Sequence, residues 1–255
     1  EHKGQSVPAS DSNSYVMGSI EAMDSDAEHH IVAVCLPFGL TEQHDAAQTM
    51  TNLRRTFPSV TTAALVGVAA SLVDSVCVGD VVVSHREGAL HVDVAHGEKL
   101  SFLPPPGRRW QSAISKLDAA VLKGKLTHLD ASAQMRNNSS HSELLAPGDR
   151  QPAIRFGPIA SASGVLSVAA RARLLECKTL CIDSNTAGFV ASSECHYLVV
   201  RGVHGSPRAE IEVAASVTRT AAVRAASYVR NVLRAMAPVE LPKGMWSSSD
   251  AGSLP

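Results

Sequence analysis

Short continuous runs of apolar residues recur along this chain, and stretches with helical periodicity lie between several of them. Such runs are typical of strands in a parallel sheet, because helices cover both faces of that sheet. The clearest run is Ile31–Leu36, which is rich in β-branched residues and is followed by Pro37 and Gly39. The pattern therefore predicts a largely parallel sheet with helices on both faces. Its strands are expected at Tyr15–Ile20, Ile31–Leu36, Ala63–Val68, Gly79–Ser84, Ala89–Val94, Ile154–Ser161, Thr179–Asp183 and Tyr197–Val203.

Four stretches have the periodicity of amphipathic helices, with Asp45 placed to cap the first of them. The helices are expected at Asp45–Arg55, Arg108–Leu122, Leu166–Glu176 and Ala209–Met236. In the second of these, Trp110, Ile114 and Leu117 fall on one stripe, which predicts that they enter the core. The arginines of the last helix are expected to form a solvated edge at Arg219, Arg224, Arg230 and Arg234.

A length of 255 residues suits one large domain with a sizeable core. We expect the domain to span residues 15–240, after a mobile, Ser-rich arm at 1–14 and before a disordered tail at 241–255. The acidic stretch Glu21–His30 reads as a hairpin loop that holds His29 and His30. The alternating run at Ala89–Val94 predicts a half-exposed strand.

Composition excludes several classes of partner. The formal net charge is −1, which provides no electrostatic footprint for nucleic acid or an anionic membrane. No apolar run approaches the roughly 18 residues of a membrane-spanning helix. The five cysteines are scattered, which predicts reduced thiols in a cytoplasmic protein and neither a metal site nor a cofactor. The first residue is Glu1 and no signal-peptide pattern follows it, as expected of a fragment or a trimmed chain.

The most informative single stretch is Cys195–Pro207, where a buried strand runs into a polar turn. Open α/β sheets bind ligands at the carboxyl ends of their strands, so this turn is expected to face a small-molecule ligand. Its candidate ligand-binding residues are Arg201, Gly205 and Ser206. A second set follows an earlier strand, where small residues let the backbone approach a ligand: Gly67, Ala69 and Ser71.

Seven segments occur in a distinctive order: Tyr15–Ile20, Val34–Pro37, Thr51–Pro58, Val66–Val68, Val78–Ser84, Thr186–Gly188 and Val200–Val203. Together they resemble the nucleoside phosphorylase and nucleosidase superfamily, which includes purine and uridine phosphorylases, and most of all its fungal branch. The resemblance covers roughly residues 15–236. It implies an α/β fold with a single three-layer domain, in which helices flank a twisted, mostly parallel central sheet. It also implies a homo-oligomer, which we expect to be a dimer or a trimer.

Members of that family cleave the N-glycosidic bond of nucleosides, a reaction that needs an acid to protonate the leaving base. The resemblance places the family's catalytic Asp at Gly205 and its ribose-binding Glu at Asn185. Gly205 has no side chain to donate a proton, and an Asn amide offers no charge-assisted acceptor. The first strand of the family, with its acidic loop, should precede Tyr15 and is absent from this sequence.

Two residues remain as catalytic candidates. His204 titrates near neutrality and is the possible substitute acid, although an extended strand turns it to the side opposite Gly205. Asp183 aligns with the first Glu of the family's Glu-Met-Glu-Ala motif. Ser184 and Asn185 follow it as candidate ligand-binding residues.

Three functions fit these observations. The first is a repurposed enzyme that acts on a small, relatively apolar metabolite, as in secondary-metabolite biosynthesis. The second is a non-catalytic domain that senses a ligand or mediates assembly. The third is retained nucleosidase or phosphorylase activity with a substitute acid. The first is our expectation, because loss of both carboxylates removes two large contributions to ordinary cleavage.

Overall fold

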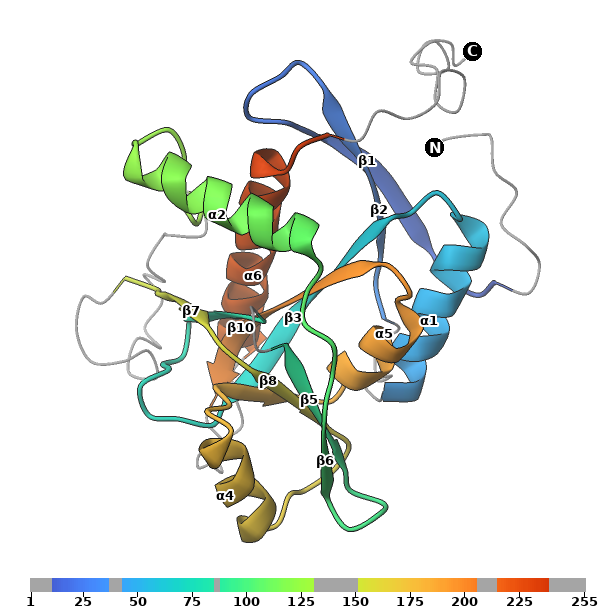
Figure 1. Cartoon of the computed structure of the whole chain (residues 1–255), viewed down its shortest axis with the longest axis vertical. Helices are drawn as coiled ribbons and strands as arrows, with labels where there is room; N and C mark the ends of the chain where they lie inside the picture. The colour runs from blue at the N-terminus through green and yellow to red at the C-terminus, as the bar shows by residue number, and fades with distance from the viewer. Residues whose placement is uncertain (1–10, 37–42, 85–87, 131–150, 206–214, 239–255) are drawn as a thin grey trace.

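The computed structural model describes residues 11–36, 43–84, 88–130, 151–205 and 215–238. Strands and helices alternate along most of this length (Figure 1). The strands are β1 (Tyr15–Glu21), β2 (Glu28–Val34), β3 (Thr62–Ser71), β4 (Val81–Val83), β5 (Ala89–Asp93), β6 (Lys99–Phe102), β7 (Ile154–Phe156), β8 (Ile159–Ala162), β9 (Cys181–Asp183) and β10 (His196–Gly205). The helices are α1 (Gln43–Thr56), α2 (Arg108–Leu122), α4 (Val168–Glu176), α5 (Thr186–Ser192) and α6 (Ala215–Ala235).

Eight of the strands form one sheet in the order β6-β5-β8-β9-β3-β10-β4-β7, and β1 and β2 form a separate hairpin. Four of the seven pairings in the large sheet are parallel and three are antiparallel. The α/β fold with a central sheet flanked by helices is confirmed. The sheet is a mixed one, in which parallel pairs hold only a narrow majority.

The stretch predicted as one strand, Ile154–Ser161, forms two strands that lie far apart in the strand order. β7 pairs with β4 at one end of the sheet, whereas β8 lies between β5 and β9. The break falls at Gly157 and Pro158, where proline has no amide hydrogen for a ladder. Because two residues bridge at most about 10 Å, the sheet must curl until β7 approaches β8 (Figure 1).

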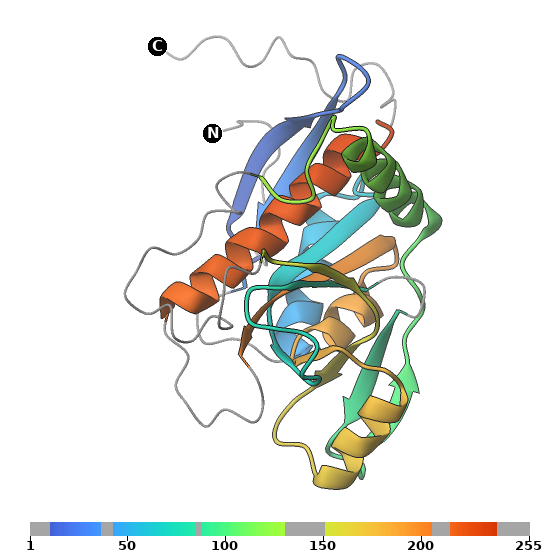
Figure 2. The same cartoon turned by 90° about the vertical axis from the view of Figure 1, so that its left-hand side faces the viewer.

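Two helical layers enclose the centre of the sheet (Figure 2). On one face α2 and α6 pack against β4 and β10, in a cluster that includes Trp110, Leu198 and Tyr228. On the other face α1 and α5 pack against β3 and β10 through Met50 and Phe189. The stripe predicted on α2 therefore enters the core, as its spacing indicated. None of the described helices is both long and apolar enough to cross a membrane.

The amino-terminal hairpin differs from its predicted form. The turn is shorter than expected, because His29 and His30 lie within β2 and not in the loop. The ring Nε2 of His29 lies 3.2 Å from the carbonyl oxygen of Met236, just after α6. Of the predicted mobile arm, residues 11–14 are described, and Asp11 accepts hydrogen bonds from Tyr15 and from Thr56 of α1. This part is therefore fastened to the domain, while residues 1–10 and 239–255 lie outside the described chain.

Three further features depart from the sequence-based expectations. β5 is largely buried and not half exposed, because Val92 packs with Leu72 and Leu174 in one apolar cluster and α5 contacts the strand. The strand β6 and the short helix α5 were not predicted at all. Arg224, expected on the solvated edge of α6, is 6% exposed and donates a hydrogen bond to the carbonyl oxygen of Gly79 at 3.2 Å.

Candidate functional site

Strand β10 presents alternate residues to opposite faces of the sheet. Leu198 and Val200 pack with α2 and α6, whereas Val199 and Val203 pack with α1 and α5. Arg201 therefore shares the face of α1 and α5. The carboxyl end of β10 lies in one row with β3 and β9, because Gly205 pairs with Ala70 and Ala70 pairs with Ile182. The fold thus brings three of the predicted segments together at one edge.

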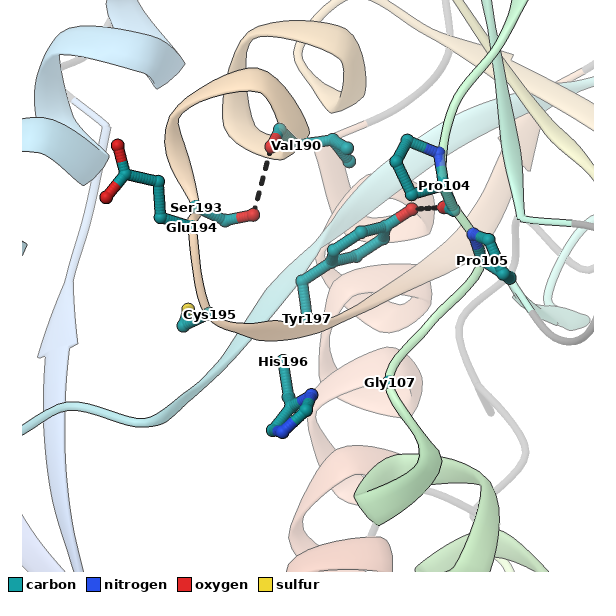
Figure 3. A pocket seen from close by; sticks show the side chains of 9 residues that line it. All are labelled: Pro104, Pro105, Gly107, Val190, Ser193, Glu194, Cys195, His196 and Tyr197. Carbon is teal, nitrogen blue, oxygen red and sulfur yellow. Dashed lines mark hydrogen bonds between the residues drawn. The ribbon is translucent and has the colours of Figure 1, made fainter.

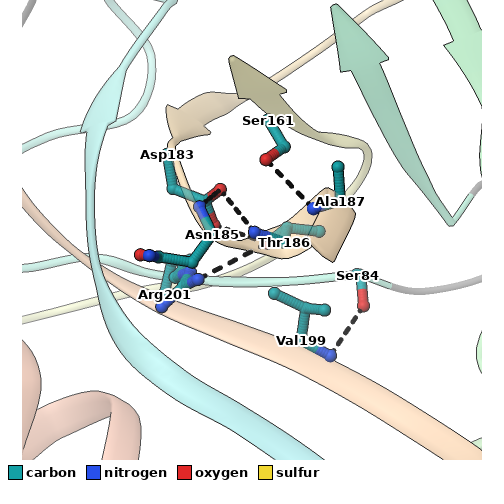
Figure 4. A network of polar contacts seen from close by, with 8 residues as sticks. All are labelled: Ser84, Ser161, Asp183, Asn185, Thr186, Ala187, Val199 and Arg201. Atoms are coloured by element: carbon teal, nitrogen blue, oxygen red, sulfur yellow. Dashed lines mark hydrogen bonds and ion pairs between the residues drawn. The ribbon is translucent and has the colours of Figure 1, made fainter. Parts of the chain in front are cut away.

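The centre of this site is a buried ion pair between Arg201 of β10 and Asp183 of β9. The guanidinium Nε lies 2.6 Å from the carboxylate Oδ2, and each side chain is only 3% exposed. Figure 4 shows that Arg201 also reaches the hydroxyl of Thr186, at 3.5 Å. Both predicted residues therefore occupy the site, and each neutralises the charge of the other.

Asp183 also holds the start of α5. Its Oδ1 accepts the backbone N–H groups of Asn185 at 3.1 Å and Thr186 at 3.0 Å, and its Oδ2 accepts the hydroxyl of Thr186. At the next residue, the backbone N–H of Ala187 donates to the hydroxyl of Ser161 at 3.0 Å (Figure 4). The carboxylate is thus occupied by four hydrogen bonds within the protein, counting the one from Arg201.

The glycine predicted to admit a ligand admits a side chain of the protein itself. Gly67 of β3 pairs with Arg201 of β10. A Cβ atom built on Gly67 would lie 2.2 Å from Nη1 of Arg201. The space above the β3 backbone is therefore taken by the guanidinium, which reaches across β3 to Asp183.

The other predicted ligand-binding residues differ in how accessible they are. Ala69 and Ser71 are 2% and 3% exposed, and the Ser71 hydroxyl donates to the carbonyl of Val73 at 2.7 Å. Ser184 and Asn185 are half-buried at the start of α5, next to the ion pair. Ser206 lies outside the described residues. Among the described candidates, Ser184 and Asn185 are thus the polar side chains that are best placed to meet a ligand.

His204 lies on the other face of the sheet from Arg201. Its Nδ1 is 3.5 Å from the hydroxyl of Thr218 on α6, and the register of β10 slips between Val203 and Gly205 at this point. Burial lowers the pKa of His204 below its usual value, because a charged imidazolium is poorly solvated there. The two catalytic candidates His204 and Asp183 thus face different layers, and little of the protonated form of His204 is present near neutral pH.

The lowered pKa of His204 predicts a pH dependence of stability. The unfolded chain binds the His204 proton more readily than the folded one, so stability should fall as the pH drops below about 6.5, the ordinary pKa of histidine. The free energy of unfolding of His204→Gln, measured by urea denaturation from pH 8.5 to 5.0, should decline less than that of the unmodified protein. Above pH 7.5 the two curves should run parallel, and equal slopes throughout would contradict the assignment.

A second feature, missed by sequence reasoning, lies at the opposite end of β10. An open cavity of about 220 Å³ is lined by Pro104, Pro105, Gly107, Val190, Ser193, Glu194, Cys195, His196 and Tyr197. Figure 3 shows the Tyr197 ring reaching toward Pro104, and the Tyr197 hydroxyl donates a hydrogen bond to the carbonyl oxygen of Pro104. The run of prolines at 104–106 was the available signal, since it marks an extended segment that cannot join a strand ladder.

The side chains that line this cavity are poorly suited to acid–base, nucleophilic or metal-assisted catalysis. Burial raises the pKa of Tyr197 to about 12 and also raises the pKa of the Cys195 thiol, so both groups keep their protons near neutral pH. Glu194 is engaged by Arg54, with 2.6 Å between Oε2 and Nη1. The described residues contain no group of three His, Cys, Asp or Glu side chains that could hold a metal ion. The region around Arg201 and Asp183, where β3, β9 and β10 meet, therefore remains the better candidate site.

Comparisons with solved structures agree with the fold. The 5'-methylthioadenosine/S-adenosylhomocysteine nucleosidase from Helicobacter pylori matches with a TM-score of 0.59 and 15% identity, over 87% of this chain and 84% of that one. The corresponding nucleosidase from Neisseria meningitidis matches with a TM-score of 0.58 and 17% identity, over 86% and 90%. Futalosine hydrolase from Helicobacter pylori matches with a TM-score of 0.55 and 15% identity, over 88% and 83%.

No protein-family model and no curated protein sequence matches the chain. The structural matches extend over most of each molecule and identify a nucleoside phosphorylase-like fold. At 15–17% identity they concern the fold and not the chemistry.

Proposed function

We propose that this protein binds a small, relatively apolar metabolite where the carboxyl ends of β3 and β10 meet the antiparallel strand β9, and that its reaction is not ordinary N-ribosyl cleavage. The observation that carries the proposal is the Arg201–Asp183 pair, which uses the buried carboxylate of the site to hold the fold together. With Gly205 beside it, no described side chain of this row is left to protonate a leaving base.

The size of the two missing contributions to catalysis supports the proposal. General acid catalysis typically contributes about 10²–10⁴-fold to a rate, and one preorganised stabilising group contributes a further 10²–10³-fold. His204 does not replace the acid, because it faces α6 and burial favours its neutral form. Neutral polar groups at Ser184 and Asn185 suit a ligand without formal charge.

The structural neighbours indicate which ligands to test first. Their names concern methylthioadenosine, S-adenosylhomocysteine and futalosine, so purine nucleosides with an altered 5' position are the leading probes. We also propose a homo-oligomer, a dimer or a trimer, which light scattering coupled to size-exclusion chromatography would test.

A non-catalytic, ligand-sensing domain is the second candidate. It is favoured by the four hydrogen bonds that occupy Asp183, since all four join the carboxylate to the protein itself. A ligand that raises the melting temperature without being converted would support this candidate over the repurposed enzyme.

The test is an assay for free base. The protein is incubated with methylthioadenosine, adenosine, inosine or uridine, with and without phosphate, and the products are separated by chromatography. We expect no base release above background with any of these nucleosides, and a rise in melting temperature with a nucleoside that stays unconverted would favour the ligand-sensing candidate. Asn185→Ala should reduce that rise, whereas Ser115→Ala, on the exposed side of α2, should leave it unchanged. Base release that His204→Ala abolishes would overturn the proposal.

A further inference from the structure

The cavity at the amino end of β10 has a fixed wall on one side, the proline segment at 104–106. The backbone N–H of Leu103 donates to a carbonyl oxygen of β5 at 2.8 Å, which ties the start of the segment to the sheet. The side-chain amide of Gln111 on α2 donates to the carbonyl oxygen of Pro106 at 2.8 Å and ties the end. The Tyr197 hydroxyl holds the middle. A wall that is already ordered loses little entropy when a ligand binds, and ligand pockets are usually preformed.

The opposite wall is the turn that joins α5 to β10. Glu194 in this turn has a φ of 25°, in the left-handed region that residues other than glycine rarely adopt. The turn is held on both sides of the strained residue. The Ser193 hydroxyl donates to the carbonyl oxygen of Val190 at 3.0 Å, and the Glu194 carboxylate lies 2.6 Å from Nη1 of Arg54. Strained residues cluster at ligand-binding sites, so this one points to a role for the cavity that it borders.

Most polar side chains of the lining are engaged within the protein. The hydroxyls of Tyr197 and Ser193 donate to backbone carbonyls. The Glu194 charge is neutralised by Arg54, and Figure 3 shows the Glu194 side chain turned away from Tyr197. A charged ligand would therefore lose hydration here without gaining an unpaired carboxylate or guanidinium. The apolar surface that remains comes mainly from Pro104, Pro105, Val190 and the ring of Tyr197.

His196 is the polar side chain of the lining that is open to solvent. Its ring lies against Gly107, since a Cβ atom built there would be 2.3 Å from Nδ1. Its backbone is fixed, because the N–H donates to the carbonyl oxygen of Thr61 at 3.2 Å and the carbonyl accepts the indole N–H of Trp110 at 3.0 Å. The imidazole is thus placed at the rim, where it can hydrogen-bond one polar substituent of a ligand.

The size of the cavity limits its occupant. A volume of about 220 Å³ exceeds the roughly 150 Å³ that holds a benzene molecule in an apolar cavity. It is smaller than the pockets of about 300–1,000 Å³ that take drug-sized ligands. Phe189 meets the Tyr197 ring edge-on from within the core, with centroids 6.2 Å apart, and so fixes the orientation of that ring. Aromatic rings pack well against such a fixed ring, which favours a ligand with one or two rings.

We propose that this cavity is a binding site for a small, uncharged aromatic molecule of one or two rings. The ring packs between the prolines and Tyr197, and a polar substituent remains at the rim beside His196. The site uses none of the residues around Arg201 and Asp183, so it is independent of the function proposed above.

The test measures the binding of benzamide to the intact protein by ligand-observed NMR. Benzamide is uncharged and has one ring and one polar substituent. We expect saturable binding with a dissociation constant below about 1 mM. Benzoate, which has the same ring with a negative charge, should bind at least about tenfold more weakly. Cyclohexanecarboxamide, which has no aromatic ring, should bind at least about threefold more weakly.

Variants locate the bound ring. Cys195→Phe places a ring in the cavity and should abolish binding, whereas Cys35→Phe, at an exposed cysteine after β2, should bind benzamide normally. If Cys195→Phe does not fold, Pro105→Ala provides the test, because it removes an exposed ring of the wall without altering the core. It should weaken binding at least about threefold, and Pro58→Ala, at an exposed proline after α1, should not.

Three results would refute the proposal. The first is the lack of saturation up to about 10 mM benzamide. The second is equal affinity of Pro105→Ala and the unmodified protein. The third is loss of benzamide binding in Asn185→Ala, which would place the ligand at the other end of β10.

Discussion

Asp183→Ala should lower the free energy of unfolding by about 3–5 kcal/mol, the range expected when one partner of a buried ion pair is removed. The cause is the uncompensated guanidinium of Arg201, which is 3% exposed and has no route to water without local opening. The same change removes the hydrogen bonds that hold the start of α5. Urea denaturation followed by circular dichroism measures the loss.

The chain offers a matched control for this experiment. Arg54 and Glu194 form an ion pair with the same 2.6 Å separation, but their side chains are 33% and 74% exposed. Glu194→Ala should therefore cost no more than about 1 kcal/mol. The combined variant Arg201→Met and Asp183→Ala should be more stable than Asp183→Ala alone, since no charge is left buried. Equal losses for the Asp183 and Glu194 variants would show that burial does not control the strength of the pair.

Gly202→Ala should be among the most destabilising single changes in the protein, with a loss above about 4 kcal/mol or no soluble folded protein. A Cβ atom on Gly202 would lie 1.9 Å from the carbonyl oxygen of Ala221 in α6, and it would be attached to the equally packed backbone of β10. Neither can move alone, because β10 is held by strands on both sides and α6 covers the core. Glycine at this position is what lets α6 approach the sheet.

Gly18→Ala is the control for this change. A Cβ atom on Gly18 meets nothing within 4 Å, so the substitution on β1 should change stability by less than about 1 kcal/mol. Thermal unfolding of both variants under the same conditions makes the comparison. A Gly202→Ala protein that melts within a few degrees of the unmodified protein would mean that α6 can shift away from β10 at little cost.

Local patterns located much of the fold because they depend on neighbouring residues. The apolar stripe of Arg108–Leu122 gave the bounds of α2 that the structure shows, and the runs at Ala63–Val68 and Tyr197–Val203 lie inside β3 and β10. The burial of a strand was harder to predict than its position, because burial depends on residues that are distant in the sequence. β5 was expected to be half exposed because its alternation is visible in the sequence, whereas the distant residues that cover it, such as Leu72 and Leu174, are not.

The candidate site also has one part that the sequence located and another that it did not. The sequence resemblance pointed to Asp183, Arg201 and Gly205 at the strand ends, and the structure places them at one edge of the sheet. The resemblance did not predict that Arg201 would neutralise Asp183. These residues are 18 positions apart, and they lie on β10 and β9, which are on either side of β3. The catalytic roles assigned to His204 and Asp183 stay predictions.

The sequence by itself determined the α/β class, most of the strands and helices, and the absence of an acidic side chain at Gly205. These properties are set by residue identity and by local periodicity. The tertiary structure alone decided which strands pair, that the sheet is mixed, that Arg201 fills the space above Gly67, and that His204 and Arg201 lie on opposite faces of the sheet. Those properties depend on contacts between segments distant in the chain, and alternation along a strand does not specify which neighbour will cover it.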